Sequence, residues 1–444
     1  MFEEACTGTE IINIIPSAGS PESVWLAWAE HLFDEFRSDV QSGKLPQVSW
    51  FVGPAGYTEH ADWPVDYGAW YISQIFDILV SNPEVFSKTV FIIDFDEADG
   101  SFDHLLPPTA PYTPAYGAST VSIENEIVTT STPNGPIGLG TRVPFLVISP
   151  WTKGGYVNSQ VFDQTSVIQF IEKRFGVFEA NISPWRRALV GDLTSMFNFA
   201  NPNDKTFSLP NTASFLPPVD ELAGANVNTF IPSLGSVILG VPQQEQGVRP
   251  AHALPYELNV HAAFDASTSS IVLRFFNKGG ATVGFQVRSG NAADLVRTYT
   301  VEQGKQLADT WSVASSYDLS VYGPNGFVRY FKGSIGSSAA ALDVFSKYKR
   351  DDFGSITWSI ANVSGIQAGV SVLAAYTGNS VTRRLRPQGK FEGELWLQQF
   401  YGWYDLIVTV AEDPTFNYRL AGHVETGRDS FSDPALGGLV TLKG

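Results

Sequence analysis

The sequence is poor in cysteine and in charge. Cys6 is the only cysteine among 444 residues, which excludes an intramolecular disulfide framework, a cysteine-rich zinc site and a CxxC redox motif. Charged residues make up 16% of the chain and hydrophobic residues 43%, with 40 glycines and 27 prolines. This composition is typical of a folded, loop-rich protein with much β structure. The length predicts two or three domains with sizeable cores.

The sequence also has no excess of basic over acidic residues and no long apolar run. The 28 Lys and Arg residues face 45 Asp and Glu, giving a net charge of -17 that repels phosphate backbones and argues against a nucleic-acid partner. A zwitterionic lipid or a small phosphodiester stays compatible, because it needs only local cation and metal contacts. No run of about 18 apolar residues predicts a transmembrane segment. The N-terminus lacks the basic region and apolar stretch of an export signal.

The N-terminal part alternates helical and strand patterns. Gly43 is a plausible helix stop, and Asp163 or Thr165 is a suitable helix N-cap. Strand, helix and strand in this order predict a parallel βαβ unit and an α/β domain. The predicted helices cover 23–42, 68–79 and 163–175, and the predicted strands cover 48–52, 89–95 and 143–149.

The segment 107–140 is long and rich in Pro, Thr, Ser and Gly, which favours a functional excursion or lid over a plain linker. Beyond a Pro- and Gly-rich stretch the texture becomes β, with strands predicted at 270–276, 283–288, 319–322 and 328–332. The pattern repeats at an offset of 85 to 87 residues: SIVLRFFNKGG parallels SITWSIANVSG, and two segments share Tyr-Asp-Leu. We therefore predict an α/β domain (1–240), a linker (241–254) and two tandem β-sandwich modules (255–340 and 345–435).

Ionisable residues gather after the predicted strand 89–95, in FIIDFDEADGSFDHLLPP. Asp96 and Glu97 come at its carboxyl end, and the loop after strand 48–52 carries His60. Because parallel neighbours open their carboxyl ends on the same edge, these side chains are expected to share a pocket. Carboxylates and imidazole are ligands for a divalent metal, which points to metal-assisted phosphoryl transfer. Acidic residues after a strand also serve as turn formers and helix caps.

Other candidate residues have equally plain alternatives. His104 is a candidate catalytic residue or a loop residue oriented by Asp103. Arg142 could clamp a phosphate, although a structural ion pair is the simpler interpretation. Aromatic residues near His60 could bind a quaternary ammonium group through cation-π contacts or could pack in the core. The loop residues preferred for this role are Tyr57, Trp63 and Tyr67.

The motifs together resemble the bacterial phosphocholine-specific phospholipase C family, which is related to acid phosphatases within the alkaline-phosphatase-like superfamily. The resemblance is carried by FDEADGSFDHLLPP, VSWFVGPAGYTEH, GLGTRVPFLVISPWTKGG and NISPWRRALVGDLTS, in the family's order over essentially the whole chain. It implies an α/β fold, a partial three-layer domain with a mostly parallel sheet, followed by two small β-sandwiches. It also implies Asp96 and Glu97 as ligands of a divalent metal, and His60 and His104 as catalytic residues.

The activity implied is hydrolysis of phosphatidylcholine, or sphingomyelin, to diacylglycerol or ceramide and phosphocholine at a membrane surface, by a secreted or periplasmic enzyme. The resemblance places the nucleophile upstream of Met1, so this chain is expected to be truncated and its activity reduced or lost. Gln164 stands where relatives often have His. Two alternatives stay open: a binding fragment that attaches through its β modules, and an acid-phosphatase-like phosphomonoesterase.

Overall fold

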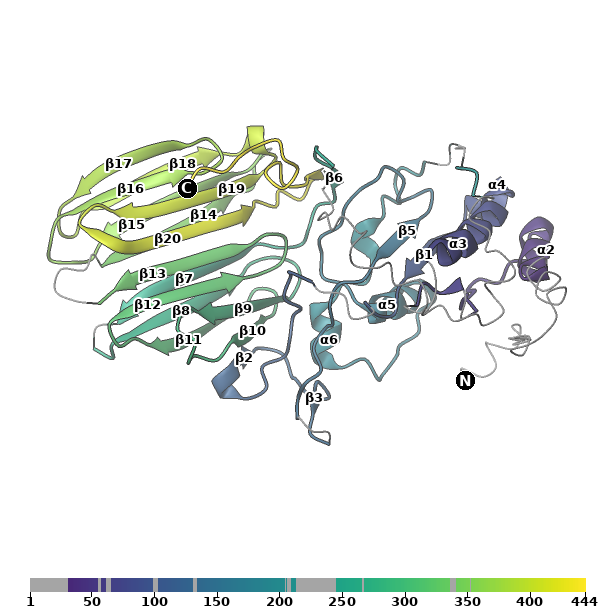
Figure 1. Ribbon diagram of the computed structural model, residues 1–444, viewed down its shortest axis with the longest axis horizontal. Helices are drawn as coiled ribbons and strands as arrows, with labels where there is room; N and C mark the ends of the chain where they lie inside the picture. The colour runs from purple at the N-terminus through teal and green to yellow at the C-terminus, as the bar shows by residue number, and fades with distance from the viewer. Residues whose placement is uncertain are drawn as a thin grey trace, which may run out of the picture. The chain divides into compact units, whose positions relative to one another are not determined.

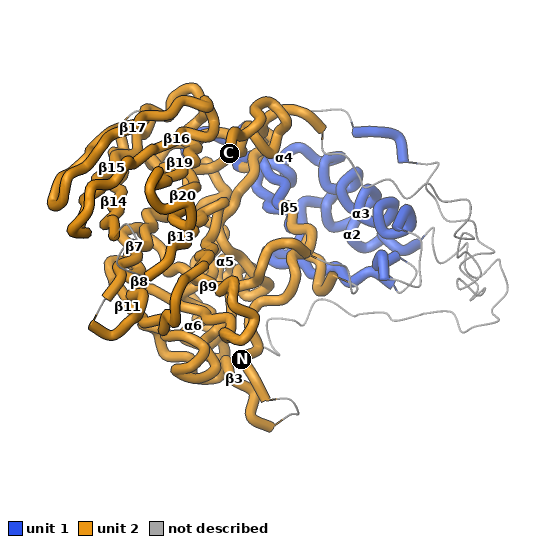
Figure 2. Tube along the Cα trace, turned by 60° about the vertical axis from the view of Figure 1, so that its left-hand side comes forward, with its two compact units in different colours: residues 1–92, 147–151, 200–242 blue, residues 93–146, 152–199, 243–444 orange. Residues whose placement is uncertain are grey.

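The computed structural model divides the chain into two compact units (Figure 2). Unit 1 comprises Met1–Ile92, Val147–Trp151 and Ala200–Pro242, and unit 2 comprises Ile93–Leu146, Thr152–Phe199 and Gln243–Gly444. The residues that the structure describes are 31–54, 57–60, 65–98, 103–130, 134–203, 205, 209–212, 245–265, 267–335, 341–351 and 353–444.

Unit 1 is built around three helices, α2 (Asp34–Ser42), α3 (Val65–Val80) and α4 (Pro83–Phe86). As the sequence predicts, α2 ends at Gly43, whose left-handed backbone (φ 68°) lets its N–H reach two carbonyls of the last turn. Asn82 caps α4 by accepting hydrogen bonds from the next turn. Apolar residues at helical spacing in α3, including Ile75 and Leu79, are buried in the core of this unit. Residues 23–30 of the predicted first helix lie outside the described residues.

Two of the three predicted N-terminal strands are present. Strands β1 (Phe91–Asp94) and β5 (Phe145–Ile148) form a two-stranded sheet. The prediction of a buried strand at 48–52 is wrong: this segment has no strand structure, and Trp50 and Val52 are 65% and 85% exposed. Strand propensity is realised only where backbone N–H and C=O groups pair with a neighbouring strand, and no strand that the structure describes pairs with this segment. The βαβ unit that the prediction built on this strand is therefore not formed.

Unit 2 begins with the end of β1 and carries the remaining helices. Helix α5 follows Asp163, which is its N-cap as predicted. The excursion 107–140 holds short strands. The elements are α5 (Gln164–Phe175), α6 (Pro184–Leu189), η2 (Pro114–Tyr116), η3 (Thr194–Met196), β2 (Gly117–Ser119), β3 (Ile127–Val128) and β4 (Gly135–Pro136).

The C-terminal part consists of β strands in two equivalent sets (Figure 1). We call them module 1 (β7–β13) and module 2 (β14–β20). Their strands are β7 (Leu258–Asp265), β8 (Ser270–Asn277), β9 (Val283–Ser289), β10 (Arg297–Val301), β11 (Gln306–Ser312), β12 (Ser316–Tyr322), β13 (Val328–Ser334), β14 (Leu342–Lys349), β15 (Ser355–Asn362), β16 (Ala368–Ala374), β17 (Asn379–Leu385), β18 (Lys390–Trp396), β19 (Trp403–Val410) and β20 (Asp413–His423), with η6 (Gln398–Phe400) before β19. A small sheet of β6 (Pro250–Ala251) and β21 (Ser430–Phe431) joins the two ends of this region.

Each module is a two-layer sandwich. In module 1 the sheet β11-β8-β7 packs on the strands β13-β12-β9-β10, and in module 2 the sheet β14-β15-β18 packs on β17-β16-β19-β20. Phe275 of β8 stacks on Tyr299 of β10 across the layers, with ring centroids 4.3 Å apart. The alternating burial of these strands explains why the sequence predicts them, since every second side chain faces the core.

The sequence repeat is also a repeat of contacts. Asn277 at the end of β8 donates through its side-chain amide to the carbonyls of Ala281 and Val301. Asn362 at the end of β15 donates in the same way to Ile366 and Leu385. Both amide oxygens accept a backbone N–H two residues further on. A buried amide that satisfies three backbone groups fixes the same turn in both modules.

The modules join edge to edge, because β13 pairs antiparallel with β20. At this junction the guanidinium of Arg329 is fully buried and donates to the hydroxyls of Tyr348 and Tyr404 and to the carbonyl of Ala421. These bonds compensate the loss of water around the cation. One apolar core therefore runs through both modules.

A strand from the excursion closes the other end of the large sheet. Residues Gly117–Ser119 (β2) pair in parallel with β10. Gly117 has φ 121°, and a Cβ at this position would collide with the backbone of Thr298. Only glycine permits this close approach. At this point the excursion is thus a structural strand that attaches the N-terminal part of unit 2 to module 1.

We expect Gly117→Ala to lower the free energy of unfolding of the chain by about 2 to 3 kcal/mol, because the new methyl group strains the backbone and separates β2 from β10. Gly140→Ala is the matched control, since a Cβ there meets no atom within 4 Å. Urea unfolding followed by circular dichroism measures both. Equal midpoints for the two variants would contradict the structural role of β2.

Candidate functional site

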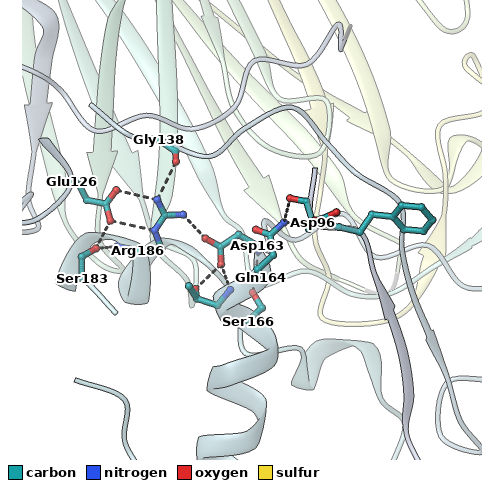
Figure 3. A network of polar contacts seen from close by, with 10 residues as sticks. Asp96, Glu126, Gly138, Asp163, Gln164, Ser166, Ser183 and Arg186 are labelled. Atoms are coloured by element: carbon teal, nitrogen blue, oxygen red, sulfur yellow. Dashed lines mark hydrogen bonds and ion pairs between the residues drawn. The ribbon is translucent and has the colours of Figure 1, made fainter. Parts of the chain in front are cut away.

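The end of β1 and the start of α5 meet in unit 2 (Figure 3). After β1 the chain continues through Phe95, whose N–H donates to the carbonyl of Pro144 at 3.4 Å, into exposed Asp96 and Glu97. The side-chain amide of Gln164 donates to the carbonyls of Phe95 and Asp96 at 3.3 and 3.4 Å. Gln164 thereby holds the backbone that presents the two predicted metal ligands. The side chain of Gln164 therefore lies at the carboxyl end of β1.

Gln164 is placed by a capped helix start. The Asp163 carboxylate accepts the N–H of Thr165 at 2.9 Å, and the N–H of Asp163 donates to the hydroxyl of Ser166 at 3.1 Å. This reciprocal capping satisfies N–H groups that the first helical turn leaves free. The helix start is therefore rigid, and with it the position of Gln164.

A buried ion-pair network fixes Asp163 in turn. The Arg186 guanidinium donates to Asp163 at 2.5 Å, to Glu126 at 3.2 and 3.3 Å, and to the carbonyl of Gly138 at 3.0 Å (Figure 3). Glu126 also accepts the hydroxyl of Ser183, which caps α6. The side chains of Asp163 and Glu126 are 7% and 2% exposed, so water screens these contacts weakly. One arginine thus connects α5, α6 and the excursion.

Asp94, the last residue of β1, carries the perturbed carboxyl group of this region. Although part of Asp94 is exposed, loss of water around its carboxyl group, followed by the negative charges of Asp163 and Asp96, raises its pKa to about 6. Negative charges near a carboxyl group oppose its ionisation. The corner formed by Asp94, Asp96 and Asp163 is therefore an electrostatically strained set of oxygen donors.

Beside this corner, Arg142 is engaged by Asp103. Its guanidinium donates to both carboxylate oxygens of Asp103 at 2.8 Å, and its backbone N–H adds a third bond at 3.0 Å. These bonds hold the pKa of Asp103 well below its usual range. Arg142 thus forms an ion pair with Asp103, while its role in substrate binding stays a prediction. The side chain of His104 is 86% exposed, and its Nδ1 lies 3.8 Å from Asp103.

The remaining candidates lie in unit 1. His60 is exposed, whereas Tyr57 and Tyr67 belong to the buried core. The Tyr57 ring packs 5.6 Å from the ring of Trp70, and burial raises the pKa of Tyr57 to about 12. Core packing accounts for both tyrosines, while their role in substrate binding stays a prediction. Trp63 lies outside the described residues. Because His60 belongs to unit 1 and Asp96 to unit 2, their shared pocket also stays a prediction.

A divalent cation would suit the acidic corner chemically. Carboxylate oxygens are the ligands that hard cations prefer. A cation would offset both the loss of water and the nearby negative charges that raise the pKa of Asp94. In the described ranges, however, no three His, Cys, Asp or Glu side chains converge as a metal site would require. The described residues therefore supply part of a ligand set, and the metal stays a prediction.

Sequence reasoning missed the residues that organise this site. The sequence places Asp94 within the predicted strand 89–95 and gives no sign that Arg186 pairs with Asp163 or Glu126. The available signal was local: Asp163 precedes a helical pattern, and Arg186 follows the N-cap signature Ser-Pro at the start of α6. Their pairing depends on the tertiary fold.

Comparison with known proteins gives two family matches. Residues 18–178 match the phosphoesterase family, and residues 250–334 match the C-terminal domain of bacterial phospholipase C. The first match includes β1, β5 and α5, and the second covers module 1.

Three relatives extend over nearly the whole chain. The non-hemolytic phospholipase C of Burkholderia pseudomallei is 44% identical, covering 98% of this chain and 61% of the relative. The non-hemolytic and hemolytic phospholipases C of Pseudomonas aeruginosa are 41% and 39% identical, each covering 91% of this chain and 60% and 59% of the relative. The chain thus spans about three fifths of the length of these relatives.

We expect Asp163→Ala to lower the free energy of unfolding by about 2 to 3 kcal/mol, because it removes a helix cap and half of the compensation of Arg186. Asp163→Asn keeps the cap and loses only the charge, so its effect should be smaller. Glu84→Ala, which breaks an exposed pair with Lys88, is the control and should cost less than about 1 kcal/mol. Urea unfolding of the three variants checks this order. An equal cost for Asp163→Ala and Glu84→Ala would refute it.

The Asp103–Arg142 pair predicts a pH dependence of stability. The pKa of Asp103 is lowered in the folded chain, so its stabilisation is complete above its ordinary value of 3.8 and is lost as the pH falls below it. Asp103→Asn should therefore destabilise the chain near neutral pH, by about 1 kcal/mol because Arg142 is largely exposed. The difference from the unmodified chain should shrink below about pH 4. Urea midpoints at several pH values test this, and a difference that persists in acid would count against the ion pair.

Proposed function

We propose that this chain belongs to the bacterial phospholipase C family and acts as a secreted phosphodiesterase that hydrolyses phosphatidylcholine to diacylglycerol and phosphocholine. Sphingomyelin, which carries the same head group, would give ceramide. The observation that carries the proposal is the order of the two family matches, phosphoesterase followed by phospholipase C C-terminal domain, along a chain that is 44% identical to a phospholipase C over 98% of its length.

The acidic corner supports the phosphodiesterase assignment. Asp96 and Glu97, held at the end of β1 by Gln164, would contribute carboxylate ligands to a divalent metal. When bound, such a metal would polarise the phosphoryl oxygen and stabilise the leaving oxygen. His60 would contact the phosphoryl group, and exposed His104 would be free to exchange a proton with the leaving alcohol. Arg142, held by Asp103, would position the loop that carries His104.

The fold proposed for the catalytic part is that of the alkaline-phosphatase-like superfamily, with a mostly parallel three-layer core. Two observations support an α/β arrangement: β1 pairs with β5, and α5 follows β5 with its N-terminus turned toward the end of β1. In α/β sheets, ligands usually bind beyond the carboxyl ends of the strands, which is where Asp96 and Glu97 follow β1. Secretion is proposed from the family. No described helix combines the length and apolar character needed to cross a bilayer.

The phosphomonoesterase alternative is favoured less. The phosphoesterase match alone is compatible with it, but the match of residues 250–334 is to a phospholipase C domain. A chromogenic phosphorylcholine ester and a simple phosphate monoester of the same alcohol separate the two. We expect faster turnover of the phosphorylcholine ester, and the reverse preference would favour the acid-phosphatase-like function.

We expect Asp96→Ala combined with Glu97→Ala to lower hydrolysis of the phosphorylcholine ester by about 100-fold or more, because the metal would lose two ligands. A chelator should lower the rate of the unmodified chain by a similar factor. Added metal should restore the rate of the unmodified chain and should not restore that of the Asp96/Glu97 variant. Asp294→Ala with Glu392→Ala removes the same charge from exposed positions of the β modules and should leave the rate unchanged. Full activity of the Asp96/Glu97 variant would exclude these residues as ligands, and a chain that releases no phosphocholine would overturn the proposed function.

A further inference from the structure

The two modules differ at equivalent sheet edges. The amides of Asn277 and Asn362 bond the last residues of β10 and β17, so these two strands are equivalent. In module 1 the edge strand β10 is covered, because β2 pairs with it. In module 2 the edge strand β17 pairs only with β16, and it ends the nine-stranded sheet (Figure 1). All its residues except Leu385 are exposed.

The residues at these edges differ in charge. Tyr299 and Thr300 of β10 are buried, and the Thr300 hydroxyl accepts the indole N–H of Trp185 at 2.8 Å. The equivalent positions in β17 are Arg383 and Arg384, both exposed. The same sandwich edge is thus a buried contact within the chain in module 1 and a cationic surface in module 2.

The cations of this surface form a cluster. Arg383, Arg384, Arg386 and Lys390 are exposed and fall within eight residues, in a segment (378–391) that contains no acidic residue. We call these four residues the β17 edge. Arg384 lies near Glu412 and donates to Gln367 at 3.5 Å.

The other three side chains make no hydrogen bond or ion pair with any residue that the structure describes. Such a cluster stands out in a chain of net charge -17.

We propose that the β17 edge docks the chain on the anionic phospholipids of a membrane surface. Guanidinium groups match phosphate geometry, and each Lys or Arg near an anionic surface strengthens binding by about fivefold. Val381 is 48% exposed and lies on the same face of β17 as Arg383, which gives the surface an apolar element. The overall negative charge does not prevent docking, because screening at physiological salt limits each charge to about 8 Å.

Protection of a free strand edge is the simpler explanation of these charges. This explanation accounts for Arg383 and Arg384, which lie within the strand. It does not account for Arg386, which lies in the turn after β17, where no further strand can pair. The inference rests on the proposed function, because an enzyme for phosphatidylcholine works at a lipid surface while its zwitterionic substrate offers no net charge for attachment.

The test is sedimentation of the full chain with vesicles of phosphatidylcholine alone or with about one third phosphatidylserine. We expect binding only to the mixed vesicles, reversed by high salt. The variant R383Q/R386Q/K390Q should lose about 100-fold in affinity. The control K278Q/R288Q/K347Q removes three exposed, scattered cations and should bind within about threefold of the unmodified chain.

Equal binding of the β17-edge variant and the unmodified chain, or equal losses in both variants, would overturn the inference. Displacement by inorganic phosphate at matched ionic strength would reassign the edge to a small anion and also overturn it. Hydrolysis of the water-soluble phosphorylcholine ester, measured without vesicles, should be the same in all three chains. Vesicle binding without any such hydrolysis would reject the proposed function and leave the docking surface standing.

Discussion

The contact between Arg186 and Asp163 is the interaction on which the candidate site depends. One guanidinium bonds two nearly buried carboxyl groups, Asp163 and Glu126. Breaking this contact would leave a buried charge without compensation, which is far costlier than loss of an exposed pair. After the loss of water around its own carboxyl group, Asp163 is the next cause that raises the pKa of Asp94. The same contact therefore sets both the position of α5 and the electrostatics at the end of β1.

Trp185, the residue before Arg186, connects helix α6 to module 1. Trp185, which is fully buried in the same short helix as Arg186, donates to Thr300 of β10, and β2 of the excursion pairs with that strand. Helix α6 thus presents one side chain to the acidic corner and the next to the β sandwich. Module 1 is consequently part of the framework that holds the candidate site, which gives a physical reason for a β domain to follow this region.

The sequence predicted the features that local patterns determine. Periodicity predicted α3 and α5, and capping predicted Asp163. Alternation predicted four strands of module 1, and the sequence repeat predicted a second module. The sequence-based prediction was wrong where the structure of a segment depends on contacts with other segments. The apolar segment 48–52 has strand propensity but no partner, and it is not a strand. The candidate site was predicted only in part: Asp96 and Glu97 do follow β1, but the environment of Asp94 and the pairing of Arg186 require contacts between segments distant in sequence.

Comparison of the two modules separates what the sandwich needs from what its surroundings need. Both keep a buried asparagine at the same turn, where its side-chain amide bonds three backbone groups. At the edge strands the demands differ. Tyr299 can be an uncharged core residue because its strand is covered, whereas a strand with a free row of N–H and C=O groups needs charge to stay soluble. Edge protection accounts for Arg383 and Arg384, which lie within β17, but Arg386 lies beyond the last residue of the strand, so the need to block strand addition does not account for a cation there.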